Sequence, residues 1–295
     1  MVLPSGLKRS VSRIREDNIH GSIDIALECC RLFLYNESAD EKVLREVALS
    51  LLEAQGSMAA VVNLVNQILH CLEDKGDIRD TVEHYIDHIV TSIDRIAENS
   101  FPLIEGKETI ITHSSGSTVR RALLYAHEKG LEPTIICTES RPIYEGKQLA
   151  EDMSDAGLDV TLVVDAAIFQ EIESADLVLL GADSISIQGL VNKIGTKGVA
   201  QVARNLRKDI YVLAGTDKVM PLGVRPYEKD LRDPGEIYKG DHGLKIKNYY
   251  FDLTSMGLMD GLVTEDGIYD IYQLMELIDR NVAHPALKKQ IDESR

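Results

Sequence analysis

The spacing of apolar residues changes near residue 100, so the two parts of the chain predict different secondary structure. Before this point apolar residues recur every three or four positions, which is typical of amphipathic helices. Polar or glycine-containing breaks separate the apolar stretches. We expect about four packed helices, in the segments 23–34, 43–52, 61–69 and 82–93.

After Pro102 short runs rich in β-branched residues alternate with stretches of helical length, a pattern typical of βαβ units on a parallel sheet. The expected strands are 109–112, 134–137, 160–164, 177–180 and 210–213, and the expected helices are 118–129, 144–156, 198–208 and 271–281. The predicted fold is therefore of the α/β class. A helical domain, residues 1–100, is followed by a Rossmann-like domain with a mostly parallel sheet, residues 101–295.

The segment 221–247 is polar, holds three prolines and several glycines, and exceeds an ordinary connection in length. Long connections of this kind are usually functional, so we expect a functional loop or an interface arm. An apolar patch at 249–251 offers further interface material, although ordinary core packing explains it equally well.

Composition narrows the classes of function. Lysine and arginine number 32 against 48 aspartates and glutamates, a net charge of −16 that repels phosphate backbones and argues against a nucleic-acid partner. Apolar runs are too short to cross a membrane, and the basic first 17 residues lack the apolar core of a signal peptide. Four cysteines without a CxxC pair favour reduced thiols. We therefore expect a cytoplasmic enzyme with no membrane partner.

Two reactive side chains stand at or just past expected buried strands. Cys137 ends the run 134–137, and Asp183 follows the run 177–180. Strand ends at one edge of an open parallel sheet face a shared crevice, so this pair suggests proton-transfer chemistry. Taken singly, Cys137 is more often a buried core thiol than a catalytic one, and Asp183 is a common type of turn or cap residue.

A run of small hydroxyl residues and glycine, Ser114, Ser115, Gly116 and Ser117, lies between an expected strand and an expected helix. Free backbone N–H groups at such a position favour an anion, so the run is a candidate phosphate cradle. Simple N-capping by Ser117 or Thr118 accounts for the same residues equally well.

Three more polar residues are placed to reach the same crevice. Arg141 lies four residues after Cys137, and Asn192 and Lys193 lie about ten residues beyond Asp183. The cations of Arg141 and Lys193 suit a phosphate or a developing oxyanion and would favour a thiolate at Cys137. The alternatives are a surface ion pair of Arg141 with Glu139 or Glu145, and a solvated Lys193. The spacing of His84 and His88 favours a polar helix face over a metal site.

The motifs together resemble those of the translation initiation factor 2B α/β/δ family. They are the segments 137–142, 145–146, 181–184, 192–196, 232–234 and 251–254, together with Lys218. The likeness is greatest to the family's archaeal ribose-1,5-bisphosphate isomerases, and more distant to its methylthioribose-1-phosphate isomerases. It implies the fold read above and gives Cys137 and Asp183 the catalytic roles.

The resemblance is imperfect near the N-terminus. Isomerases of this family carry an Arg-Gly-Ala motif that holds a phosphate, whereas this chain has His20 and Gly21 in the corresponding stretch 19–22. Gly215-Thr216-Asp217-Lys218 also replaces the more usual Glu-Thr-Tyr-Lys, and Ser255-Met256 stands where a proline pair often follows. These departures indicate a side branch with a related substrate. His20, Gly21 and Lys218 are the remaining candidate substrate-binding residues.

The resemblance implies an aldose–ketose isomerase that converts ribose 1,5-bisphosphate to ribulose 1,5-bisphosphate in nucleotide breakdown. A protonated Asp183 would open the sugar ring and a Cys137 thiolate would move the proton, or a hydride would shift; neither route requires a metal or an organic cofactor. Both side chains would need a shifted pKa. The alternative is a non-catalytic regulatory subunit that binds a nucleotide or sugar phosphate and contacts translation initiation factor 2. The resemblance also implies a homodimer or homohexamer and leaves a nucleotide effector open.

Overall fold

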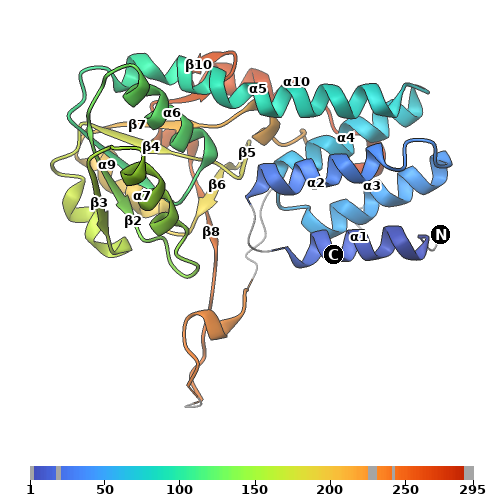
Figure 1. The fold of residues 1–295 in the computed structure, drawn as a ribbon, viewed down its shortest axis with the longest axis horizontal. Coiled ribbons are helices and arrows are strands. Elements are labelled where there is room, and N and C mark those ends of the chain that lie inside the picture. Colours follow the sequence, from blue (N-terminus) through green and yellow to red (C-terminus); the bar gives the residue numbers. More distant parts are fainter. Residues whose placement is uncertain (1–2, 18–20, 225–230, 241–242, 289–295) are drawn as a thin grey trace.

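The computed structural model describes residues 3–17, 21–224, 231–240 and 243–288, and it joins a layer of helices to a layered α/β unit (Figure 1). His20 therefore lies outside the described residues. The helical layer contains α1 (Ser5–Glu16), α2 (Ser22–Leu34), α3 (Glu41–Gln55), α4 (Ala59–Glu73) and the long α5 (Ile78–Ile104).

The helical layer forms because each helix directs an apolar stripe into one shared core. Two helices begin at aspartate caps, where Asp40 accepts from the N–H of Lys42 and Asp77 accepts from that of Asp80. The helices expected between 23 and 93 are confirmed. Helix α1 was missed, because only Leu7, Val11 and Ile14 of its twelve residues are buried and its pattern is mostly polar.

The main sheet has seven strands in the order β10-β9-β7-β4-β1-β2-β3. All its neighbours are parallel except β10, which runs antiparallel to β9. The strands are β1 (Thr109–His113), β2 (Thr134–Thr138), β3 (Val160–Val163), β4 (Leu177–Leu180), β7 (Asp209–Leu213), β9 (Gly261–Thr264) and β10 (Gly267–Tyr269). The five strands expected from the sequence are confirmed.

Helices cover both faces of this sheet, so its central strands are buried on both sides. One face packs against the end of α5 together with α6 and α7, and the other against α8, α9 and α10. These helices are α6 (Ser117–Glu128), α7 (Glu145–Asp155), α8 (Ile168–Glu171), α9 (Thr196–Asn205) and α10 (Ile271–Arg280). The expected α/β fold with a mostly parallel sheet is confirmed.

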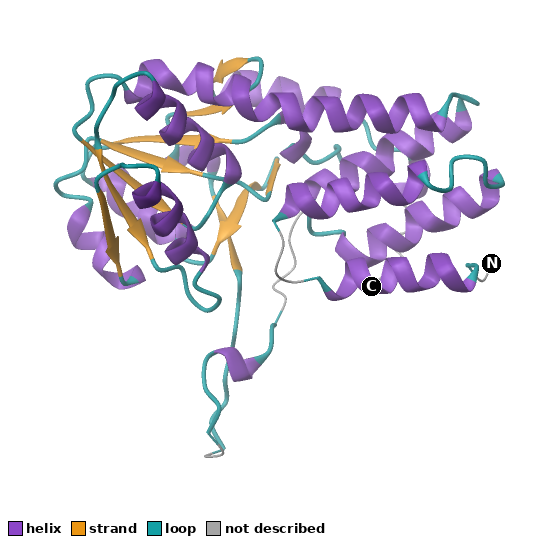
Figure 2. Cartoon of the chain, viewed as in Figure 1, coloured by secondary structure: helices purple, strands orange, loops and turns teal. Residues whose placement is uncertain are grey.

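A small antiparallel sheet, which the sequence pattern did not predict, lies beside the large one. It contains β5 (Ser184–Ser186), β6 (Gly189–Lys193) and β8 (Phe251–Thr254), with β6 in the middle. The described residues 231–240 and 243–248 precede β8 as an arm that projects away from both layers (Figures 1 and 2). Among the described residues no helix combines the length and apolar character that a membrane span requires.

Candidate functional site

The predicted site residues of the large sheet lie where its central strands end. Loops follow β1 at Ser114, β2 at Glu139 and β4 at Gly181, all at the same edge because these strands are parallel. The first and third loops touch, since a Cβ added at Gly116 would lie 3.6 Å from the Cα of Gly181. One strand, β1, separates the strands that carry Cys137 and lead to Asp183. Two strand spacings amount to roughly 10 Å, about the span of a phosphorylated pentose.

Cys137 is the fourth residue of β2 and is fully buried, paired in register with Thr112 and Leu162. Burial raises the pKa of its thiol to about 11, and no neighbouring cation opposes the shift. The expectation that Arg141 and Lys193 favour a thiolate is therefore wrong for the free protein. The physical reason is that both cations have other partners.

Asp183 lies just beyond β4, where its N–H donates to the carbonyl of Val191 at 2.9 Å and joins the two sheets. Its side chain is half-buried and makes no hydrogen bond within the described parts of the chain. Loss of water raises the pKa of the carboxyl group. The ammonium groups of Lys218 and Lys193 oppose this shift, and the Glu145 carboxylate adds to it. Together these effects leave the pKa of Asp183 above the usual aspartate value.

Lys193 is buried at the end of β6, so the solvated alternative is wrong. Its Nζ lies 2.6 Å from Glu145 Oε1 and 5.1 Å from the centre of the Tyr250 ring. The neighbouring Asn192 is also buried, and its amide donates to Thr196 Oγ1 at 3.0 Å. The small sheet thus carries a rigid cation to the edge of the large one.

Lys218 connects the helical layer to the same edge. It is buried in a short 3₁₀ turn (Thr216–Lys218), and its Nζ donates to Ser22 Oγ at 2.6 Å. Ser22 is the first residue of α2, whose cap Gly21 provides no side-chain hydrogen bond. The N-terminal N–H groups of α2 and a buried ammonium therefore lie together, an arrangement that suits an anion.

The candidate cradle after β1 has the backbone that an anion site needs. The cap of α6 is Gly116, without a side-chain hydrogen bond, so capping by Ser117 or Thr118 is not what the structure shows. Thr118 Oγ1 instead donates to the carbonyl of Leu213 at 2.6 Å. Ser115 and Ser117 are exposed, and Ser114 has a left-handed backbone with φ of 75°.

Arg141 is exposed on the loop after β2. Its guanidinium lies 5.1 Å from the centre of the Tyr144 ring, a cation–π contact. The alternative ion pairs of Arg141 are not formed, because Glu139 pairs with Lys147 at 3.5 Å and Glu145 pairs with Lys193. Of the predicted site residues, Arg141 is therefore the most loosely held.

His113, at the end of β1, fixes the loops around the site. Its Nε2 lies 2.9 Å from the Ile194 carbonyl and its Nδ1 lies 2.7 Å from Thr138 Oγ1. Burial lowers the pKa of the imidazole, so the ring is neutral. The carbonyl must receive the Nε2 proton, and Nδ1 then accepts from Thr138. The ring thereby joins β1 and β2 to the loop beside Lys193.

Sequence reasoning missed two acidic residues as members of the site. Glu145 Oε2 and Asp217 Oδ2 are buried oxygens without a hydrogen-bond partner, although Lys218 Nζ lies 3.4 Å from Asp217 Oδ2. Ser184 Oγ, next to Asp183, is a third such atom. Unsatisfied buried polar atoms are costly and commonly mark ligand sites. The earlier signals were the position of Glu145 in the motif 145–146 at the start of an expected helix and the place of Asp217 beside Lys218.

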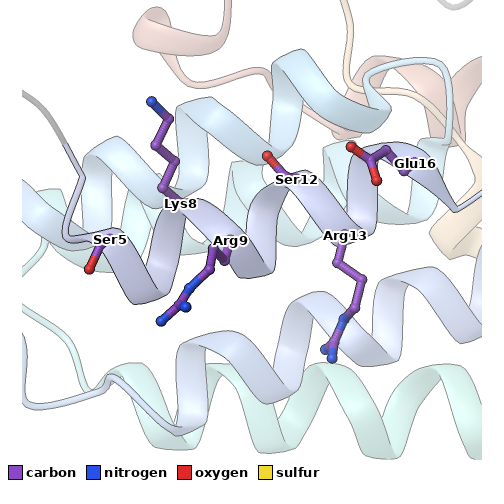
Figure 3. A pocket seen from close by; sticks show the side chains of 6 residues that line it. All are labelled: Ser5, Lys8, Arg9, Ser12, Arg13 and Glu16. Carbon is purple, nitrogen blue, oxygen red and sulfur yellow. The ribbon is translucent and has the colours of Figure 1, made fainter.

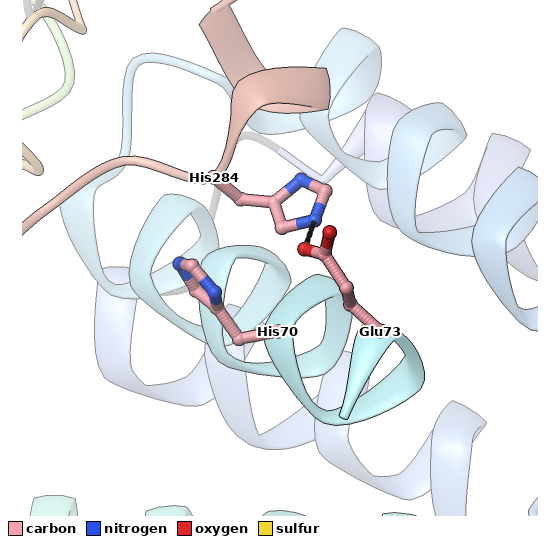
Figure 4. A group of neighbouring side chains, drawn as sticks. All are labelled: His70, Glu73 and His284. Carbon is pink, nitrogen blue, oxygen red and sulfur yellow. Dashed lines mark hydrogen bonds and ion pairs between the residues drawn. The ribbon is translucent and has the colours of Figure 1, made fainter. Parts of the chain in front are cut away.

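Away from this edge, His70, Glu73 and His284 bring potential metal ligands within 4.8 Å of one another (Figure 4). The ring of His284 donates from Nε2 to Glu73 Oε2 at 2.8 Å, because its Nδ1 accepts from the N–H of Ala286 at 3.1 Å. A histidine that binds a metal through one ring nitrogen needs the other ring nitrogen protonated and facing an acceptor. We therefore interpret the group as a hydrogen-bonded clasp between α4 and the C-terminal segment.

A pocket of about 560 Å³ lies along one face of α1 (Figure 3). It is lined by Ser5, Lys8, Arg9, Ser12, Arg13 and Glu16. Its basic character contrasts with the net charge of the chain, yet none of the predicted site residues lines it.

The comparisons with known proteins agree on one family. The model of the Initiation factor 2 subunit family matches residues 18–271. The chain is 31% identical over 245 residues to the ribose 1,5-bisphosphate isomerase of Methanocaldococcus jannaschii, covering 79% of each. It is 30% identical over 277 residues to a Pyrococcus furiosus protein named as eIF-2B subunit 2-like, covering 90% of this chain and 97% of that protein.

Among solved structures, the translation initiation factor eIF-2B of Pyrococcus horikoshii superimposes with a TM-score of 0.80 at 26% identity. The match covers 91% of this chain and 98% of that one. The whole arrangement of helical layer and sheet, and not only the sheet, is therefore shared.

Proposed function

We propose that this chain, which belongs to the Initiation factor 2 subunit family, is a sugar-phosphate isomerase. It converts a pentose phosphorylated at C1 into the matching ketose, with ribose 1,5-bisphosphate as the leading substrate and ribulose 1,5-bisphosphate as the product. Such a reaction belongs in nucleotide breakdown, where phosphorylated ribose is released. The likeness to the Methanocaldococcus jannaschii isomerase over most of both chains supports this choice.

One observation carries the proposal: a carboxyl group with a raised pKa lies near two buried ammonium groups at the end of a parallel sheet. Asp183 supplies the acid, and Lys193 and Lys218 supply the cations. An acid is needed to open a sugar ring, and cations are needed to hold a phosphate. Ser114 to Ser117 and the start of α2 offer further N–H groups for phosphate oxygens.

The reaction requires ring opening first, because a phosphate on C1 prevents spontaneous opening to an aldehyde. Asp183 donates its proton to the ring oxygen, and the bond between that oxygen and C1 breaks. In one route C2 then loses a proton, C1 gains one, and the C2 hydroxyl loses its proton. In the other a hydride moves from C2 to C1 and the C2 hydroxyl loses its proton. Either route leaves a C2 carbonyl and a phosphate on C1.

Cys137 is the proposed proton acceptor in both routes. With a pKa of about 11 only roughly one thiol in 10,000 is ionised at pH 7, yet that thiolate is a strong base. The proton that Asp183 donates is recovered from Cys137 at the end of the cycle. The site then returns to its starting state without a net gain or loss of protons.

Incubation of the purified chain with ribose 1,5-bisphosphate, ribose 1-phosphate and methylthioribose 1-phosphate tests the proposal. Carbon NMR should show a C2 carbonyl signal with at least one of them, and ribose 1,5-bisphosphate should react fastest. In deuterated water, deuterium at C1 indicates proton transfer and its absence indicates a hydride shift. No conversion of any sugar 1-phosphate would refute the proposal.

A second function is supported by the likeness to the Pyrococcus furiosus protein, which extends over nearly the whole of that protein. In this alternative the chain is a regulatory subunit that contacts translation initiation factor 2. Sedimentation of the chain with purified translation initiation factor 2 separates the two functions. Co-sedimentation without turnover supports the regulatory subunit, and turnover without co-sedimentation supports the isomerase.

A further inference from the structure

Glu145 lies where three segments of the site meet: the loop after β1, the end of β2 and the end of β6. It is the first residue of α7, and the backbone of the next residue, Gly146, packs directly onto the carbonyl of Thr138 at the end of β2. Ser114 Oγ, from the loop after β1, donates to Glu145 Oε1 at 3.0 Å. Lys193 Nζ, from the end of β6, lies 2.6 Å from the same oxygen.

The two carboxylate oxygens of Glu145 have different surroundings. Oε1 receives both the Ser114 hydroxyl and the Lys193 ammonium, whereas Oε2 is buried and accepts no hydrogen bond. A buried carboxylate oxygen without a donor is costly. Such an atom persists where the surroundings hold it in place, and in this protein the firm binding of Oε1 does so.

The charge of Glu145 acts on Asp183. The groups that influence the Asp183 carboxyl are Lys218 on the 3₁₀ turn, Lys193 on β6 and Glu145 on α7. The two ammonium groups favour the carboxylate form, whereas burial, which is the largest effect, and the Glu145 charge favour the acid form. Glu145 opposes them twice, because it repels a second carboxylate directly and neutralises Lys193.

We propose that Glu145 is a positioning residue of this site, whose carboxylate fixes the Lys193 ammonium at the sheet edge that carries Asp183. The inference deepens the proposed function and rests on it, because Asp183 is the acid that ring opening requires. The charge of Glu145 also opposes the effect of the two buried lysines on the Asp183 carboxyl. A bound phosphate would take over part of the Lys193 charge.

Titration of Asp183 in protein labelled with ¹³C at the aspartate carboxyl carbons tests this role without any need for turnover. Its NMR signal is assigned by its loss in Asp183→Asn. In Glu145→Gln the side chain keeps its size but loses its charge, so the Asp183 midpoint should fall by about one pH unit or more. In Glu145→Asp, which keeps the charge, the Asp183 midpoint should fall by less.

Glu139→Gln is the matched control, because Glu139 lies on the same loop and pairs with a different lysine, Lys147. Its Asp183 midpoint should equal that of the unmodified chain. Should Glu145→Gln fail to fold by circular dichroism, Glu145→Ala provides the same loss of charge. An Asp183 midpoint that stays unchanged or rises in the folded uncharged variant overturns the inference. Failure of the proposed function would be recognised by a different observation, the absence of turnover by the unmodified chain.

Discussion

At the scale of single residues, burial decides which chemistry each side chain of the site offers. Cys137 is fully buried, and its thiol is therefore hard to ionise. The pKa of the Asp183 carboxyl is raised by loss of water and by Glu145, while Lys218 and Lys193 oppose the shift. The account therefore assigns an acid and a strong base to one sheet edge.

Substitution tests the assigned roles of these two residues. Cys137→Ser and Asp183→Asn should each lower kcat by at least about 10²-fold, because each removes a proton-transfer group. Circular dichroism should show that both variants remain folded. Cys29→Ser is the matched control: Cys29 is also a buried thiol, but it lies in the helical layer, and its variant should keep its turnover. Near-normal activity in either site variant would refute that residue's role.

The raised pKa of Asp183 also makes a prediction about stability. A carboxyl group whose pKa is higher in the folded state binds its proton more tightly there, so it stabilises the fold at low pH. This contribution is lost as the pH rises from about 3.9, the usual aspartate value, through the raised folded value. As the pH rises across this window, the melting temperature of Asp183→Asn should therefore increase relative to that of the unmodified chain. A constant difference between the two would contradict the raised pKa.

The sequence was sufficient to place Cys137 and Asp183 near one sheet edge, because their distance from predicted strand ends follows from local pattern alone. Lys193 was expected there only from its separation of about ten residues from Asp183, since the strand β6 that ends with it was not predicted. It was not sufficient to pair Lys193 with Glu145, since 48 positions separate the two and two different sheets bring them together. The pKa of Cys137 could also not be predicted from the sequence. It depends on the complete burial of the thiol and on where the neighbouring cations find partners.

At the scale of elements, five of the seven strands of the large sheet, with α6, α7, α9 and α10, were predictable because their apolar positions make short continuous or periodic runs. The strands β9 and β10 and the short helix α8 were not predicted. The small sheet was not, since β5 has only three residues and β8 includes polar positions. Helix α1 was missed for a related reason: three buried side chains give too weak a periodic signal. The boundary between domains at residue 100 stays a prediction.

The contact between β2 and α7 yields a test at this scale. A Cβ at Gly146 would lie 1.8 Å from the Thr138 carbonyl oxygen, so Gly146→Ala must push α7 away from the strand that holds Cys137. We expect a loss of about 1–3 kcal/mol in the free energy of unfolding, together with loss of turnover. Urea unfolding measures the first.

Gly6→Ala is the control for this substitution, because Gly6 also lies in a first helical turn but has open space around its Cβ position. Its stability should change by less than about 1 kcal/mol, in the favourable direction. Equal effects of the two substitutions would show that the packing of α7 on β2 is not tight.

At the scale of the whole molecule, the arm at 231–248 stands apart from both layers (Figure 2). It exposes large apolar side chains, with 58% of Leu231 and 62% of Leu244 accessible. Exposed apolar residues on a projecting segment are typical of interfaces. The arm therefore supports the expectation of a homodimer or a larger homo-oligomer, which remains a prediction.

Sedimentation velocity tests that expectation. The unmodified chain should sediment as a dimer or larger species, and Leu244→Asp should shift it toward the monomer, because a charge at an apolar interface is costly. Val90→Asp alters a residue that is also exposed but lies on α5, and it should leave the assembly unchanged. A monomer at micromolar concentration for the unmodified chain would contradict the prediction.

The central claim is that Cys137 and Asp183 act on the same sugar from opposite sides of β1. A crystal structure with an unreactive sugar 1-phosphate analogue measures this most directly. The account predicts that C1 and C2 of the analogue lie between Cys137 Sγ and the Asp183 carboxyl, with the phosphate on Lys193 or Lys218. An analogue seated elsewhere, or one that touches only one of the two catalytic groups, would contradict it.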